Sequence, residues 1–88
     1  MEPVTVSPLL YVLKLENNKY YVGTTYNLNI RYAQHLQGHG AKWTRLHKPI
    51  SIIEVRIPAT SGLENSVVKE YFDKFGKENV RGGSWCQV

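Results

Sequence analysis

Residues 9–25 read LLYVLKLENNKYYVGTT. They contain two apolar, β-rich runs, Leu9–Leu15 and Tyr20–Thr25, separated by the polar residues 16–19. A polar loop between two such runs predicts a β-hairpin. A loop of two or four residues would put Tyr11 and Tyr21 on opposite faces of the sheet, whereas an odd loop or a bulge would bring them to the same face. The sequence leaves this relation open.

The next segment predicts a helix that begins after Asn27, whose side chain can cap it, and runs to about Leu36. Gly38 and Gly40 predict its end. We expect one short turn at Ala41 to Arg45.

A third strand is predicted from Ile50 to Ile57, between Pro49 and Pro58. A second long helix should follow a cap at Thr60 or Ser61 and end at about Phe75, before the C-terminal cap Gly76. The apolar stripe of this helix consists of Leu63, Val67, Tyr71 and Phe75, widened by Val68 and Phe72. The expected fold is therefore α+β: a small three-stranded, mostly antiparallel sheet flanked by helices, in the order β-β-α-β-α.

Composition places this fold in one domain, residues 1–88, with 42% apolar residues. No apolar run approaches the ~20 residues that a membrane span needs. The single cysteine, Cys86, excludes an intramolecular disulfide and a cysteine cluster for zinc. No basic, apolar leader is visible, so we expect an intracellular protein of the cytoplasm or nucleus that is not secreted. Trp85 predicts that the glycine-rich tail docks onto the domain.

Charge is distributed unevenly along the chain, whose net charge is +4. Residues 17–53 contain no acidic side chain, whereas they contain all three histidines and several lysines and arginines. A stretch of one sign favours a face that meets phosphate. The alternative is a chance gap in a short chain.

Five side chains have the chemistry that phosphodiester hydrolysis requires. Tyr11 can take or relay a proton from water, and Glu64 can hold Mg²⁺ or Mn²⁺. Arg31 can bind a phosphate in a fork, while Tyr21 and His35 can position the nucleophile or shuttle protons. Arg31 and His35 are four residues apart and share a helical face. Each residue alone has a structural explanation, and it is the set that points to catalysis.

In this order and spacing, the set resembles the GIY-YIG nuclease family over Leu9 to about Lys69. The first triplet is Leu9-Leu10-Tyr11, without the family's glycine, and the second is Tyr21-Val22-Gly23. Residues 38–45 resemble the Gly-x-Gly-Ala-Lys-x-Thr segment of a branch that includes a structure-specific endonuclease subunit. Thr24 departs from the family, because the excision-repair member has a lysine at that position.

The resemblance implies that Tyr11, Tyr21, Arg31 and His35 are catalytic and that Glu64 is the metal ligand. It implies a DNA endonuclease that uses Mg²⁺ or Mn²⁺ and leaves a 5′-phosphate and a 3′-hydroxyl. Because we see no appended recognition domain in 88 residues, we expect nicking or cleavage of branched or nicked DNA, in DNA repair or recombination, with or without a protein partner that supplies specificity.

Residues 42–48 interleave basic and aromatic side chains, which is typical of contact with a nucleic-acid backbone. We assign DNA contacts there to Lys42, Thr44, Arg45 and Lys48. His35 and His39 have a spacing found in zinc sites, but glycines interrupt the helix that would align them, so zinc is not expected.

Two rival functions remain at this point. The first is a catalytically inactive module of the same fold that binds DNA or recruits partners to it. The second is a structural interaction domain, which would not need Arg31, His35 and Glu64 together.

Overall fold

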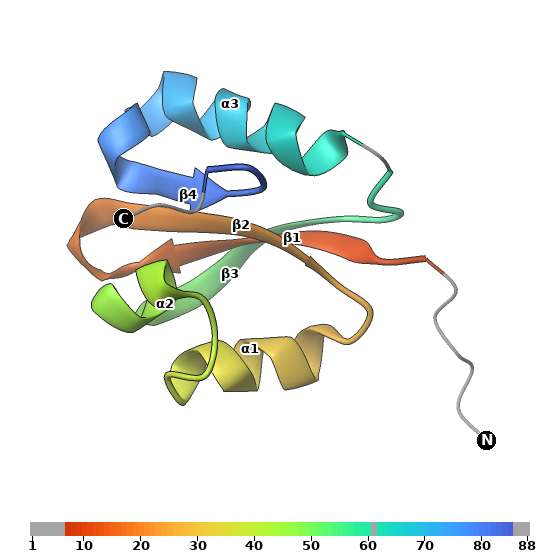
Figure 1. Ribbon diagram of the computed structural model, residues 1–88, viewed down its shortest axis with the longest axis horizontal. Coiled ribbons are helices and arrows are strands. Elements are labelled where there is room, and N and C mark those ends of the chain that lie inside the picture. Colours follow the sequence, from red (N-terminus) through yellow and green to blue (C-terminus); the bar gives the residue numbers. More distant parts are fainter. Residues whose placement is uncertain (1–6, 61, 86–88) are drawn as a thin grey trace.

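Strand β1 (Leu9–Leu15) is an inner strand of the sheet and is buried on both faces. The computed structural model describes residues 7–60 and 62–85. Leu10 and Val12 point to one face, and Tyr11, Leu13 and Leu15 to the other. The sheet order is β3-β1-β2-β4, with β2 at Lys19–Thr25, β3 at Pro49–Arg56 and β4 at Val80–Gly82. Helices cover both faces (Figure 1).

The hairpin turn has an odd number of residues. It is the 3-10 turn η1 (Glu16–Asn18), and β2 begins at Lys19, one residue earlier than the sequence predicts. Asn17 and Asn18 have φ angles of 65° and 58°, a left-handed conformation that asparagine tolerates better than most residues. Leu13 is therefore paired with Tyr21 and Tyr11 with Gly23. Tyr11 and Tyr21 lie on the same face of the sheet.

The sheet has a fourth strand, so the prediction of three strands was wrong. β4 pairs in parallel with β2, and the sheet is mixed, although its other two pairings are antiparallel. The strand spans three residues and ends in glycine, which is too short for an alternating pattern. Its pairing depends on the free edge of β2, a tertiary feature that the local sequence does not contain.

The two faces of the sheet have separate cores. Helix α3 (Leu63–Phe75) covers one face, where Val67, Val68 and Tyr71 pack against β1 and β2. Helices α1 (Leu28–Leu36) and α2 (Lys42–Leu46) lie on the opposite side (Figure 1), where Trp43 packs in the second core. The Trp43 indole donates a hydrogen bond of 2.9 Å to the Tyr20 carbonyl, which holds α2 to β2. The short turn predicted at Ala41–Arg45 is this helix.

The helix ends agree with the prediction at all but one position. The Asn27 side chain accepts a hydrogen bond of 3.2 Å from the Ile30 amide, and Gly76 ends α3 at a φ of 93°. The start of α3 differs, because its N-cap is Gly62 at a φ of 82°. Thr60 contributes its backbone carbonyl, which accepts a hydrogen bond of 3.0 Å from Leu63, while Ser61 lies outside the described residues.

Strand β3 forms an edge of the sheet and contains register shifts opposite β1. Its side chains Ile53 and Val55 are exposed, as is Ile57 directly after the strand, which ends one residue earlier than predicted. The tail docks as predicted: the Trp85 ring meets the Phe72 ring edge-on, with centroids 5.3 Å apart.

No helix in ranges 7–60 and 62–85 combines the length and the apolar character required to cross a membrane.

Candidate active site

Tyr11 is the centre of a buried polar cluster between the sheet and α1. Its side chain is 1% exposed, and its hydroxyl lies 2.8 Å from His35 Nε2. The Tyr11 ring passes over Gly23 on β2. A Cβ atom at Gly23 would lie 2.5 Å from Tyr11 Oη, a distance that real Cβ contacts do not show. The glycine of Tyr21-Val22-Gly23 therefore provides the space that Tyr11 occupies.

His35 connects Tyr11 to α2. It is 1% exposed and projects from the last turn of α1, and its Nδ1 lies 2.9 Å from Thr44 Oγ1. The imidazole sits against Gly40, where a Cβ atom would come within 2.1 Å of Nδ1. The segment between α1 and α2 thus approaches the ring closely, which only glycine permits. Gly38 follows the end of α1, as the sequence predicts, and Gly40 permits this close approach, which the sequence analysis does not predict.

Tyr21 and Arg31 complete the cluster around the Tyr11 hydroxyl. The Tyr21 ring is half-buried, with its centroid 6.3 Å from that of Tyr11 and 5.2 Å from that of His35. The half-buried Arg31 donates a hydrogen bond of 3.0 Å to Gln34 Oε1. Arg31 is also close enough to Tyr11 for hydrogen bonding and charge to lower the Tyr11 pKa. The i, i+4 spacing places Arg31 and His35 on one helical face, as predicted, and the structure turns that face toward Tyr11.

Glu64 lies in the other helical layer, near enough for its charge to act on Tyr11. It lies in the first turn of α3 and is half-buried, and its negative charge contributes to raising the pKa of Tyr11. The backbone amide of Gly83 hydrogen-bonds to its carboxylate. The neighbouring Asn65 accepts a hydrogen bond of 3.0 Å from the Ser84 amide and donates one of 3.2 Å to Ser84 Oγ. These hydrogen bonds hold the tail beside Glu64 at the start of α3. The sequence analysis does not predict this contact.

Burial controls the protonation of the cluster. Burial first, and then interaction with Tyr21 and Glu64, raises the pKa of Tyr11 to about 12, against the opposing effect of Arg31. Burial, with the nearby charge of Arg31, lowers the pKa of His35 to about 4. At neutral pH, Tyr11 is therefore protonated and His35 is neutral. Burial also raises the pKa of Glu64, partly offset by Gly83.

The comparison with protein families identifies the domain. The model of the GIY-YIG catalytic domain matches residues 7–78, a range that includes all five side chains. The chain belongs to the GIY-YIG family.

Relatives in the GIY-YIG family include small bacterial UPF0213 proteins. The chain is 34% identical to one from Fusobacterium nucleatum over 74 residues, which are 81% of this chain and 73% of that protein. It is 43% identical to one from Cupriavidus necator over 44 residues, 50% of this chain and 48% of the relative. It is 37% identical to YazA of Bacillus subtilis over 49 residues, 56% and 50% of the two chains. The match spans about half the length of several of these relatives. No solved structure gives a significant match.

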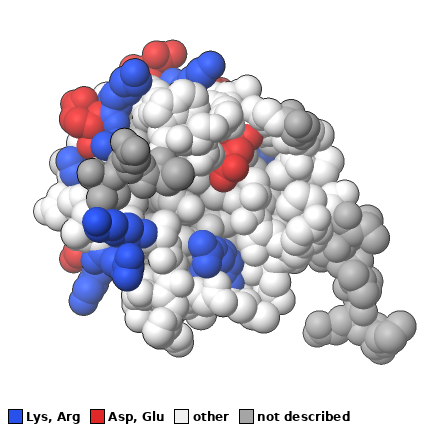
Figure 2. Space-filling view, in the orientation of Figure 1, with Lys and Arg blue, Asp and Glu red and all other residues white. Residues whose placement is uncertain are grey.

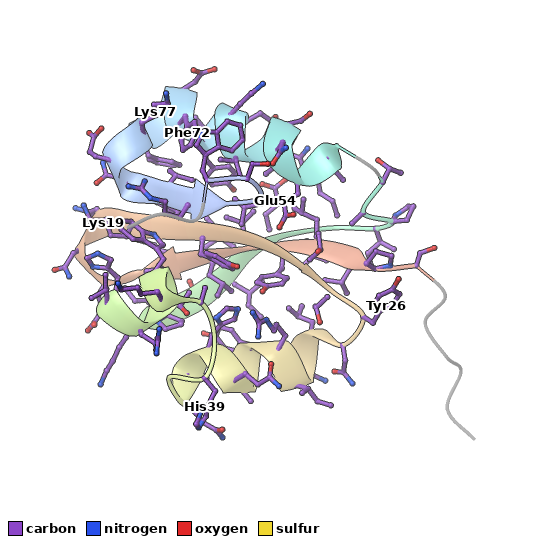
Figure 3. All side chains as sticks on the ribbon, in the orientation of Figure 1. Lys19, Tyr26, His39, Glu54, Phe72 and Lys77 are labelled. Atoms are coloured by element: carbon purple, nitrogen blue, oxygen red, sulfur yellow. The ribbon has the colours of Figure 1, made fainter. Side chains whose placement is uncertain are left out.

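Members of the GIY-YIG family are in general nucleases that act on DNA. GIY-YIG nucleases are in general dependent on a divalent metal ion. Within the described ranges, no group of three or more His, Cys, Asp or Glu side chains could hold such an ion. The single carboxylate of Glu64 still fits Mg²⁺ or Mn²⁺, because Mg²⁺ keeps several waters and accepts phosphate oxygens as further ligands. His35 faces Tyr11, whereas His39 is exposed at the outer end of α1 (Figure 3).

The basic segment predicted to contact DNA divides into exposed and buried residues. Lys42, Arg45 and Lys48 are exposed, and basic side chains gather over α2 (Figure 2). A pocket of about 320 Å³ lies between this surface and the cluster. Its lining consists of His35, Leu36, Gln37, Gly38, Thr44, Arg45 and Lys48. Thr44 is only 1% exposed, so its predicted contact with DNA does not fit its position. Sequence analysis also missed Arg81, whose guanidinium lies 4.6 Å from the centroid of the Trp43 ring.

Proposed function

We propose that the protein is a divalent-metal-dependent DNA endonuclease that leaves a 5′-phosphate and a 3′-hydroxyl. The convergence of charged and titratable groups on one buried oxygen, Tyr11 Oη, carries this proposal. His35 Nε2 is 2.8 Å away, and the charges of Arg31 and Glu64 both change the Tyr11 pKa. These groups come from β1, α1 and α3, and a packing tyrosine does not require such neighbours.

Tyr11 acts in this proposal as the base for the attacking water. Its hydroxyl proton passes to His35 Nε2, and the tyrosinate oxygen then takes a proton from water as the water oxygen bonds to phosphorus. The bond from phosphorus to the 3′ oxygen breaks, and that oxygen takes a proton from solvent. Arg31 stabilises the negative charge on the tyrosinate and on the phosphate oxygens.

Glu64 is the residue that would hold the metal ion. When bound, a divalent cation supplies positive charge against the phosphate and lowers the pKa of a coordinated water. The half-buried position of Glu64 strengthens such electrostatic interactions relative to open water. The Gly83 amide fixes the carboxylate from the side of the tail.

The exposed basic residues Lys42, Arg45 and Lys48 are proposed to bind phosphates of the DNA backbone. The pocket beside His35 is open to the same surface and can accept a phosphate that flanks the cleavage site. Contacts to phosphate position DNA without reading its bases. They favour nicking or structure-directed cutting over recognition of a long sequence.

The proposal is tested by cleavage of supercoiled plasmid and of a labelled branched duplex, with Mg²⁺ or Mn²⁺. Wild type is compared with Glu64→Ala and Tyr11→Phe. Glu78→Ala and Tyr26→Phe are the matched controls, because both residues are exposed and lie outside the cluster. We expect cleavage by wild type and both controls, and none by the site variants or with chelator. Binding without cleavage by wild type in every condition would instead favour a catalytically inactive docking module.

A further inference from the structure

Three buried polar side chains form an unbroken hydrogen-bonded series behind the candidate base. Tyr11, His35 and Thr44 are each 1% exposed. Tyr11 Oη is 2.8 Å from His35 Nε2, and His35 Nδ1 is 2.9 Å from Thr44 Oγ1. The series ends at the Ala41 carbonyl, 2.8 Å from Thr44 Oγ1.

The carbonyl at the end sets the direction of every proton in the series. A carbonyl oxygen can only accept, so the Thr44 hydroxyl donates its single proton to Ala41. This bond to the carbonyl three residues earlier is one that threonine forms readily in helices. Thr44 Oγ1 can then only accept from His35, so Nδ1 carries the imidazole hydrogen. Nε2 has the free lone pair, and Tyr11 donates to it.

We propose that Thr44 is a positioning residue that holds His35 in its Nδ1–H tautomer, with Nε2 ready to receive the proton of Tyr11. The reaction step assigned to Nε2 rests on the proposed nuclease function, whereas the tautomer itself does not. Thr44 acts through His35 and needs no contact with the substrate. This role replaces the DNA contact predicted from the sequence.

The acceptor role of Thr44 also suits the product of proton transfer. When Nε2 gains a proton, Nδ1 still carries its own, and both ring nitrogens donate. The bond from Nδ1 to Thr44 is therefore unchanged, and the new Nε2–H donates to the tyrosinate oxygen. No group behind His35 has to turn during the step. The close approach of Gly40 to Nδ1 keeps the ring in this orientation.

The opposite tautomer would disturb the series at both ends. Hydrogen on Nε2 would require Thr44 to donate to Nδ1, leaving two oxygens 2.8 Å apart at Ala41 with no proton between them. Tyr11 would accept from Nε2 and could no longer give its proton to it. Because Thr44 Oγ1 lies 2.9 Å from Nδ1, its hydroxyl is placed to determine which tautomer His35 adopts.

The test compares Thr44→Val, which removes the hydroxyl at nearly constant shape, with Thr44→Ser, which retains it. Nitrogen-15 NMR of histidine-labelled protein near pH 7 reports the tautomer, with the His35 signals assigned from His35→Gln. Circular dichroism confirms that each variant is folded. We expect the Nδ1–H form in wild type and Thr44→Ser, and a large Nε2–H population in Thr44→Val. An unchanged Nδ1–H tautomer in Thr44→Val would overturn the proposal, whether or not the protein cuts DNA.

Cleavage kinetics give the second readout. Loss of an orienting partner commonly lowers activity by about 10–100-fold. We therefore expect Thr44→Val to lower kcat by that factor with little change in KM, and Thr44→Ser to recover most of it. Equal losses in the two variants would mean that Thr44 only packs. A wild type that cuts no DNA would refute the nuclease function, and the NMR result would still decide the tautomer.

Discussion

Gly23→Ala offers a sharp test of the way the sheet makes room for Tyr11. The new Cβ would lie 2.5 Å from Tyr11 Oη, 2.7 Å from its Cζ and 2.9 Å from Tyr21 Cε2. Ordinary van der Waals contact begins at 3.4 Å, so the Tyr11 hydroxyl must move by about 0.9 Å (3.4 minus 2.5). Both rings are confined by the second core, and neither can move without cost.

The expected effects are a loss of stability and a larger loss of activity. Overpacking of a filled core costs about 1–3 kcal/mol. In a domain of this size, each kcal/mol lowers Tm by about 4–8 °C. A catalytic group displaced by about 1 Å can lose ~100-fold in rate. Thermal unfolding and plasmid cleavage, both recorded on the same preparation, measure the two effects.

Gly62→Ala is the matched control for this variant. Its Cβ would meet nothing within 4 Å, but its φ of 82° strains any side chain. It should therefore lose about 1–2 kcal/mol of stability and cut DNA at the wild-type rate while folded. Wild-type stability and cleavage in Gly23→Ala would refute the close approach of Tyr11 to β2.

Three further predictions concern charge. Burial and Arg31 lower the pKa of His35 to about 4, so the unfolded chain binds the histidine proton more tightly than the folded chain does. The free energy of unfolding should therefore fall by about 3 kcal/mol as the pH drops from 6.5 to 4. Urea titrations should show a shallower fall in His35→Gln. A steeper fall in that variant would contradict the buried, neutral imidazole. Glu64 has its pKa raised by burial, so its contribution to stability is present below its unfolded pKa and is lost as pH rises through the raised folded pKa. Compared with wild type, Glu64→Gln should therefore gain more stability at pH 7 than at pH 4. It should also abolish Mn²⁺ binding measured by calorimetry, and retained Mn²⁺ affinity would exclude Glu64 as the ligand. The triple variant Lys42→Ala, Arg45→Ala, Lys48→Ala should reduce the slope of log affinity for duplex DNA against log salt by about 0.9 for each phosphate that the variant no longer neutralises. Lys74→Ala, on α3, should leave that slope unchanged, and equal slopes in the triple variant and wild type would remove α2 from the DNA surface.

The sequence predicted the helices well because their signals are local. The Asn27 cap, the Gly76 stop and the apolar stripe of α3 each depend on residues within one or two turns. The shared direction of Arg31 and His35 follows from the helical repeat alone. Strand β4 depends instead on its pairing with β2, more than fifty residues away. Its own three residues are too few to form a pattern that predicts a strand.

The relation of Tyr11 to Tyr21 depended on one residue at the hairpin. Lys19 pairs with Leu15 and so leaves a three-residue turn, which places both tyrosines on one face. The sequence favours the loop for Lys19, because lysine is less common in strands than the tyrosines and valine that follow it. The burial of Thr44 was missed for a similar reason. Basic neighbours indicated an exposed segment. The side chains of Trp43 and Thr44, on the five-residue helix α2, are instead buried in the protein.

The tail of the chain contributes to the site in a way that no local pattern reveals. Gly83 has a φ of 54°, and a Cβ there would lie 2.1 Å from Asn65 Oδ1. This glycine therefore lets the backbone approach the start of α3, where its amide reaches Glu64. The sequence predicted that the tail docks because of Trp85, but it did not show that the tail docks beside the proposed metal ligand.

The most direct test of the central claim is the single-turnover rate at which wild type and Tyr11→Phe nick supercoiled plasmid in Mn²⁺. We predict measurable nicking by wild type that stops on addition of chelator, and no nicking by a folded Tyr11→Phe protein. Equal nicking by the two proteins would contradict the role of Tyr11 as the base.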